Sequence, residues 1–144
     1  MTAIAFTIPG RIGGKGRPRF ARRGAHMVAY TDAKTVKGEA LVRQLASLAM
    51  NGHPILEGPL ALSVTVTVQP PPSWSKKKRA AATYLTGKPD CDNQIKLLAD
   101  SMNNIVYHDD SQICDVRFSR RYDANASESV FVEILPLHGK VAAE

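Results

Sequence analysis

The acidic residues of this chain are concentrated in one stretch. Although the formal net charge of the 144 residues is +6, six of the 13 Asp and Glu residues lie between Lys88 and Asp115. Carboxylates crowded in this way repel one another unless a cation neutralises them. A hard ion such as Mg²⁺, which takes oxygen ligands and only a few protein carboxylates, suits such a cluster. The stretch therefore predicts metal binding, by residues drawn from Asp90, Asp92, Asp100, Asp109, Asp110 and Asp115.

The first two aspartates of the stretch are two residues apart. Pro89 disfavours a helical conformation for the residue before it and leaves the chain after it free to be extended. In an extended chain, residues two apart point to the same side, so Asp90 and Asp92 would face one point while Cys91 points away. This spacing predicts a carboxylate pair that could share an ion. From the residues alone, a helix-capping role for the pair is about as good an explanation.

A helix is expected directly after this pair. From Asn93 on, apolar residues recur at the i, i+3, i+4, i+7 spacing of an amphipathic helix, and Asp92 or Asn93 can cap it. The free N–H groups and partial positive charge of its N-terminus would suit carboxylates or a phosphate. Lys96 is expected one turn in, on the polar face, with Asp100 as its i, i+4 partner. The apolar stripe consists of Ile95, Leu98, Ala99 and Met102, and Asn103 and Asn104 are expected to end the helix.

The order Asp-x-Asp-Asn-x-x-Lys, then a helix, then Asp-Asp at the head of a strand resembles the RusA family of Holliday junction resolvases. These are small metal-dependent endonucleases of bacteria and their phages. The resemblance is clear over residues 60–132 and extends over the rest in layout only. It implies that Asp90, Asp92 and Asp110 are the catalytic, metal-binding carboxylates and that Lys96 is the active-site lysine. It favours Asp110 over its neighbour Asp109, and it implies Mg²⁺, or Mn²⁺ in its place, as the cofactor.

The resemblance also implies an activity and an assembly. The expected reaction is metal-dependent cleavage of four-way DNA junctions by paired symmetric cuts, in DNA recombination and repair. Paired cuts with one site per chain require a twofold homodimer, which the family likeness also suggests. Two alternatives stay open: a non-catalytic nucleic-acid-binding module whose acidic cluster is only helix caps and solvated charge, and a nuclease of the same chemistry that acts on forks or flaps.

The basic charge is concentrated in the first part of the chain. Residues 1–89 hold 14 Lys and Arg against three acids, whereas residues 90–144 hold five against ten, so the two parts carry +11 and −5. A basic surface around an acidic pocket is expected of a protein that holds a phosphate backbone. Between Arg11 and Gly24, six cations alternate with glycines and no acid is present. This segment is expected to contact DNA, with a solvated mobile loop as the alternative. The residues predicted to bind DNA are Arg17, Arg19, Arg22, Arg23, Lys76, Lys77, Lys78, Arg117 and Arg120.

The remaining pattern predicts an α/β or α+β fold in a single domain covering residues 1–144, with a mixed sheet packed against helices and a flexible tail from about residue 138. Strands are expected at residues 4–8, 26–30, 60–68, 113–122 and 130–135, the last two as a hairpin. A helix is expected from residue 31 or 32 to about residue 50, with Val36, Leu41, Leu45, Leu48 and Ala49 on one side, and a short helix after Ser73.

Several other classes of function find no support in the sequence. No run of about 18 apolar residues could span a membrane and no signal peptide is recognisable, so the expected location is the cytoplasm. Cys91 and Cys114 make neither a disulfide framework nor a zinc pattern, and each is expected to be a small packed residue. No nucleophile motif accompanies the four histidines. Trp74, beside the basic run, is expected to pack on the sheet rather than to stack on a base.

Overall fold

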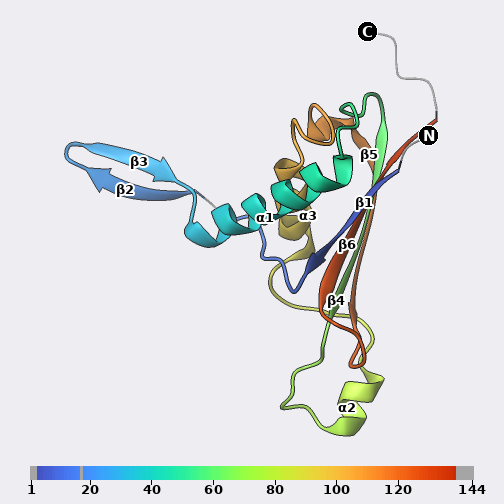
Figure 1. Cartoon of the computed structure of the whole chain (residues 1–144). Helices are drawn as coiled ribbons and strands as arrows, with labels where there is room; N and C mark the ends of the chain where they lie inside the picture. Colours follow the sequence, from blue (N-terminus) through green and yellow to red (C-terminus); the bar gives the residue numbers. More distant parts are fainter. Residues whose placement is uncertain (1–2, 17, 139–144) are drawn as a thin grey trace.

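The computed structural model describes residues 3–16 and 18–138 (Figure 1). The expected tail at residues 139–144 and Arg17 lie outside the described residues. No helix of the described residues combines the length and the apolar character needed to cross a bilayer. In chain order the elements are β1 (Ile4–Pro9), β2 (Arg19–Arg23), β3 (His26–Tyr30), α1 (Ala33–Met50), β4 (Leu60–Val68), α2 (Lys76–Ala81), α3 (Cys91–Ser101), the 3₁₀ turn η1 (Asp110–Gln112), β5 (Ile113–Tyr122) and β6 (Ser129–Pro136).

Four strands form one mixed sheet in the order β1-β6-β4-β5. β6 is antiparallel to both of its neighbours, whereas β4 and β5 are parallel. The predicted hairpin of β5 with β6 is therefore wrong, because the chain crosses over β4 after β5. β6 pairs with β1 on one side and β4 on the other, and its Val130, Val132 and Ile134 are at 0 % exposure. The basic β5 is more exposed and lies at an edge, where charged side chains reach water.

One face of the sheet carries the core. Alternate residues of β4, from Leu60 to Val68, are at most 3 % exposed, because successive side chains of a strand point to opposite faces. α1 and α3 lie against this face (Figure 1). Together these elements confirm the predicted fold class, a single α+β domain with a mixed sheet.

α1 is amphipathic, but its buried face differs from the expected one. The structure buries Val42, Ala46 and Met50, whereas Val36 and Leu48 are 52 % and 68 % exposed. Leu41 is also exposed, at 38 %, so the expected grouping on one side was wrong for these three residues. The helix boundaries were predicted well, because they depend on local chemistry. The N-cap Asp32 accepts a hydrogen bond from Thr35 N at 2.9 Å, and Asn51 ends the helix in the left-handed conformation.

β2 and β3 form a separate two-stranded sheet that extends away from the body (Figure 1). The strands are antiparallel, from Arg19 opposite Tyr30 to Arg23 opposite His26, and Gly24 in the turn between them has a φ of +63°. We call residues 19–30 the arm. Its strand residues are all exposed except the half-buried Ala21. The segment from Arg11 to Gly24 was expected to be a loop that contacts DNA, with a solvated mobile loop as the alternative, and its second part is instead the regular strand β2.

Candidate active site

α3 begins earlier than its apolar spacing predicted, and this changes how its first aspartates lie. Asp90 is the N-cap residue and Asp92 lies in the first helical turn, so the prediction of an extended chain across both is wrong. An acidic residue in the first turn is favoured by the helix dipole, which explains the early start. Asp90 makes no side-chain cap hydrogen bond; instead its carboxylate pairs with Lys88 Nζ at 2.9 Å in an exposed position. The capping explanation therefore finds no support for Asp90.

The rest of α3 turns its apolar residues to the core and its lysine outward. Its buried residues include Leu97, Leu98 and Ser101, while Lys96 is exposed as predicted. The expected stripe was shifted, since Ile95 is only half-buried and Gln94 is 3 % exposed. Cys91 and Cys114 are both exposed and free. Their expected packing was wrong, because one lies at the open end of α3 and the other on the edge strand β5.

Asp109 and Asp110 have different surroundings. The Asp109 carboxylate caps η1, accepting a hydrogen bond from Ser111 N at 3.1 Å, and Gln112 completes a capping box. Hydrogen bonds from Ser111 hold the pKa of Asp109 below its usual range. The Asp110 carboxyl group caps no helix and instead contacts the side chains of Asp100 and Asn103.

The Asp110 carboxyl group lies in hydrogen-bond contact with that of Asp100. This contact, with burial and the charge of Asp100, raises the pKa of Asp110. Burial also raises the pKa of Asp100, but hydrogen bonds from Lys15 and from Asp110 outweigh it and lower that pKa. The opposite directions are those expected of two neighbouring carboxyl groups, of which Asp110 is the easier to protonate.

Lys15 is a site residue that the sequence analysis did not single out. Its Nζ lies 2.9 Å from Asp100 Oδ2 and 3.6 Å from Glu39 Oε1, with all three side chains about three-quarters buried. Hydrogen bonding to Asp100 raises the pKa of Lys15. Among the described residues Asp100 makes no ion pair with Lys96, so its expected i, i+4 partner was wrong. The signal for Lys15 was available in its two flanking glycines, Gly14 and Gly16.

These glycines allow the loop to lie directly on α3 and α1. Lys15 N donates to Asn93 O at 3.0 Å. A Cβ at Gly14 would stand 2.9 Å from Asn93 Cβ and 3.3 Å from Pro89 Cβ. A Cβ at Gly16 would collide with Asp32 Oδ2. We call residues 12–16 the latch segment, because it fastens the chain between β1 and the arm to the start of α3.

Arg120 holds the segment that leads into α3. Its Nη1 donates to Pro89 O at 2.5 Å and to Gln94 Oε1 at 3.3 Å, and its Nη2 donates to Gly87 O at 3.3 Å. Gln94 Nε2 in turn donates to Ile12 O at 3.1 Å, in the latch segment. The Arg120 guanidinium therefore positions the start of α3. Its predicted DNA contact stays untested.

Tyr107 closes the other end of α3. Its side chain is fully buried, and its hydroxyl donates to Ala99 O at 2.6 Å. Burial, with the nearby charges of Asp110, Asp100 and Asp109, raises the pKa of Tyr107 well above its usual value. The hydroxyl is thus kept neutral as a hydrogen-bond donor, and it ties the chain just before η1 to the last turn of α3.

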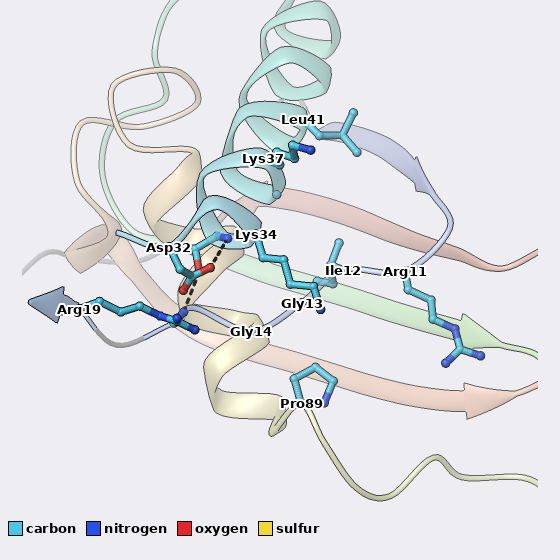
Figure 2. A pocket seen from close by; sticks show the side chains of 13 residues that line it. Arg11, Ile12, Gly13, Gly14, Arg19, Asp32, Lys34, Lys37, Leu41 and Pro89 are labelled. Carbon is cyan, nitrogen blue, oxygen red and sulfur yellow. Dashed lines mark hydrogen bonds between the residues drawn. The ribbon is translucent and has the colours of Figure 1, made fainter. Parts of the chain in front are cut away.

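A cleft of about 710 Å³ opens between the latch segment and α1 (Figure 2). Figure 2 shows Arg19 and Arg11 at opposite sides of this cleft, and Lys34 extending from the first turn of α1 toward Gly13. Pro89, next to Asp90 in the chain, also contributes to the lining. Four cations against one acid make this a basic cleft that reaches the start of α3: Arg11, Arg19, Lys34 and Lys37 against Asp32.

The other predicted DNA-binding residues lie on separate surfaces. Arg19, Arg22 and Arg23 are exposed on the arm, Arg117 is exposed on β5, and Lys76, Lys77 and Lys78 are exposed on α2. Trp74 packs against Tyr122 with ring centroids 5.4 Å apart, and Lys78 Nζ lies 4.1 Å from the centre of the Trp74 ring. The contact with β5 supports the packing interpretation of Trp74.

The donors of the predicted metal site are carboxylate oxygens, which fit Mg²⁺ or Mn²⁺ by type. The structure brings Asp110 together with Asp100 and Lys15. Within residues 3–16 and 18–138, no three or more Asp, Glu, His or Cys side chains gather closely enough to hold one ion. Asp92 and Asp100 are also about 12 Å apart along the helix axis, given a rise of about 1.5 Å per residue. The shared binding of one ion by Asp90, Asp92 and Asp110 therefore stays a prediction.

Comparisons with known proteins agree with the predicted chemistry. Residues 9–135 match the family model of endodeoxyribonuclease RusA. The chain is also similar to the uncharacterized protein YqaN of Bacillus subtilis (strain 168), with 34 % identity over 144 residues that cover 94 % of this chain and 96 % of that protein. The family match includes the latch segment, the arm, α3 and η1, so it spans every element of the candidate site.

Proposed function

Because the chain belongs to the RusA family of endodeoxyribonucleases, we propose that it resolves four-way DNA junctions by paired symmetric cleavage of phosphodiester bonds, in DNA recombination and repair. The observation that carries this proposal is the family match over residues 9–135, which includes Asp90, Asp92, Lys96 and Asp110 in the order of the motif. The raised pKa of Asp110 beside Asp100 adds support, because acids with a shifted pKa are typical of functional sites.

We assign metal binding to Asp90, Asp92 and Asp110. An Mg²⁺ or Mn²⁺ ion there would lower the pKa of a bound water and stabilise negative charge on the phosphate. Asp90 and Asp92 are exposed, and neither carboxylate caps α3. Lys96, one helical turn after Asp92, would bind a phosphate oxygen and offset charge in the transition state. Arg120 and the latch segment would keep the first turn of α3 in place during cleavage.

The basic cleft and the arm would bind the DNA backbone. Cations attract phosphates regardless of sequence, and the bound counterions of the DNA are released on binding. Lys34, Lys37 and Arg19 line the cleft next to Pro89, so a strand held there would lead toward Asp90. Selectivity for a branched substrate would then come from the angle between the cleft and the arm.

The proposed enzyme acts as a homodimer. A junction has two opposed strands to cut, and two sites related by a twofold axis match that symmetry. Light scattering at the working protein concentration is the direct measurement. We expect a dimer. A monomer that still makes paired nicks would contradict this part of the proposal.

The substrate is tested by offering the protein a labelled four-way junction beside a fork, a flap and a linear duplex, each with Mg²⁺, Mn²⁺ or EDTA. We expect symmetric nicks on the junction alone, and only with a metal ion. Preferred cutting of forks or flaps would keep the chemistry and change the substrate. Binding of DNA without cutting in every condition would replace the proposal with a non-catalytic binding module.

A further inference from the structure

A second hollow lies between α2 and β5, apart from the basic cleft. It has a volume of about 420 Å³. Three aromatic side chains from three parts of the chain line it, namely Trp74, Tyr84 and Tyr122, together with Lys78 and Thr86. We call this hollow the aromatic pocket. No residue of the proposed metal site contributes to it.

Hydrogen bonds hold the walls of the aromatic pocket in place. Leu85 N donates to Arg120 O at 3.0 Å and Tyr122 N donates to Thr83 O at 2.9 Å, so the segment around Tyr84 runs antiparallel beside β5. Arg79 Nη1 donates to Pro70 O at 2.7 Å, which ties α2 to the prolines after β4. A ligand would therefore enter a preformed site, without the cost of ordering the chain.

The aromatic rings are incompletely used by the fold. Trp74 and Tyr122 meet edge to face, yet both stay half-buried. Tyr84 is 65 % exposed, and the Arg121 guanidinium lies 5.6 Å from its ring centre. Rings that served only to stabilise the fold would be expected to bury more of their apolar surface. Exposed aromatic rings beside cations are the combination that stacks the bases of single-stranded nucleic acid.

The positive charge around the aromatic pocket also favours a nucleic-acid ligand. Between Gln69 and Pro89 the sequence has five Lys and Arg residues and no acid. Lys78, which lines the pocket, and Arg121, beside Tyr84, add positive charge directly next to the rings. A ligand complementary to this site combines an aromatic plane with negative charge, which describes one nucleotide unit of a DNA strand.

The aromatic pocket is also close to the proposed site along the chain. Thr86 lines the pocket and precedes Asp90 by four residues. Since an extended chain spans at most about 3.6 Å per residue, the Cα atoms of Thr86 and Asp90 lie within about 14 Å of each other. A strand in contact with Asp90 would therefore pass within a few nucleotides of the pocket.

We propose that the aromatic pocket binds one unpaired base of the DNA strand, a few nucleotides from the bond to be cut. The position relative to the cut rests on the proposed function. The binding of an unpaired base is independent of the proposed function, because it needs neither a metal ion nor cleavage. A base read at this place would contribute to the choice of the cutting site.

Trp74 is the only tryptophan of the chain, so its fluorescence reports on this pocket alone. The full-length protein is titrated in EDTA with an unlabelled oligothymidylate, and binding is followed in parallel by anisotropy with a labelled one. We expect the oligonucleotide to quench Trp74. Tyr84→Ala is expected to raise Kd by about fivefold or more, the low end for one base–aromatic stack. The matched control is Phe131→Ala, a 43 % exposed aromatic residue of β6 that does not line the aromatic pocket.

Three results would overturn the proposal for the pocket. Binding by anisotropy without a change in Trp74 emission would place the DNA elsewhere. If Tyr84→Ala and Phe131→Ala lose the same affinity for the oligonucleotide, with unchanged thermal unfolding of both, the pocket has no specific role in binding. Equal quenching by a duplex of the same length would show that no unpaired base is needed. If the protein does not cleave junctions but the oligonucleotide still quenches Trp74, the proposed nuclease function is refuted, while the base-binding role of the pocket is still supported.

Discussion

Lys15 Nζ lies 2.9 Å from Asp100 Oδ2 and fastens the latch segment to the last turn of α3. The same lysine donates its backbone N–H to Asn93 O in the first part of this helix. One residue thus contacts α3 near both of its ends. The Lys15–Asp100 pair thus helps to hold against the body the latch segment that precedes the arm in the chain.

Lys15→Met should lower the free energy of unfolding by about 1–3 kcal/mol, because it removes charged hydrogen bonds and leaves Asp100 and Glu39 without their cation. Urea denaturation measures the change. The matched control is Lys34→Met, since Lys34 is exposed and makes no ion pair with a described residue. Equal losses of unfolding free energy in the two variants would show that the Lys15 contacts do not stabilise the fold more than an exposed lysine does.

Gly14→Ala should displace the latch segment, because its Cβ would meet Asn93 Cβ at 2.9 Å and Pro89 Cβ at 3.3 Å. We expect a loss of about 1–3 kcal/mol, typical of overpacking, together with weaker DNA cleavage. Gly13→Ala is the control, because a Cβ there meets nothing within 4 Å. The account of the latch segment fails if thermal unfolding and cleavage of the two variants are alike.

Arg120→Lys should lower stability by about 1–2 kcal/mol, because a lysine cannot reproduce the guanidinium contacts to Pro89 O, Gly87 O and Gln94. Arg117→Gln on the same strand should leave stability unchanged, since Arg117 is exposed. If Arg117 contacts a phosphate, the salt dependence of DNA binding should weaken by about one unit of slope. Unchanged stability of Arg120→Lys together with weaker DNA binding would instead make Arg120 the DNA contact.

Asp110→Asn should stabilise the protein at pH 7 by about 0.5–1 kcal/mol, a modest value because solvent screens a partly exposed pair. The raised pKa of Asp110 means that the folded state keeps a proton after the unfolded chain has released it. Wild-type stability from this group therefore falls as the pH rises above about 4 and through the raised pKa. Asparagine does not ionise, so the advantage of the variant should narrow as the pH is lowered.

Thermal unfolding from pH 3 to pH 8 checks this dependence. Asp115→Asn serves as the control, since Asp115 is an exposed aspartate of the same acidic stretch. An Asp110→Asn variant that is less stable than wild type at neutral pH would mean that the Asp100–Asp110 contact is not repulsive. The contact would then have no need of a functional explanation.

The parts of the fold that depend on local chemistry were predictable from sequence. The alternation from Leu60 to Val68 and the cap at Asp32 each act over a few residues, and the structure confirms β4 and α1. The start of α3 was missed, because the apolar spacing marks where a helix is buried and not where it begins. The position of β6 was missed because strand order is set by pairing between distant parts of the chain, and a hairpin was only the simplest connection.

The candidate site shows the same limit. Carboxylates and Lys96 are visible as a motif, since their spacing lies within one helix and one turn. The contacts of Lys15 with Asp100, and of Arg120 with Pro89, join residues far apart in the chain and follow only from the packing of the latch segment and β5 on α3. Glycines beside a lone lysine were the one available sign of such packing.

The central claim is that the acidic residues cut junction DNA, and one experiment addresses it directly. A labelled four-way junction is incubated with wild type, Asp90→Asn, Asp92→Asn, Asp110→Asn and the control Asp115→Asn, each with Mg²⁺ or EDTA, and nicking and binding are both measured. The account predicts symmetric Mg²⁺-dependent nicks by wild type and the control. It predicts no cutting by the other three variants, with junction binding retained or tighter because carboxylate repulsion is relieved. Full cleavage by Asp92→Asn or Asp110→Asn, or equal loss of binding and cutting, would contradict it.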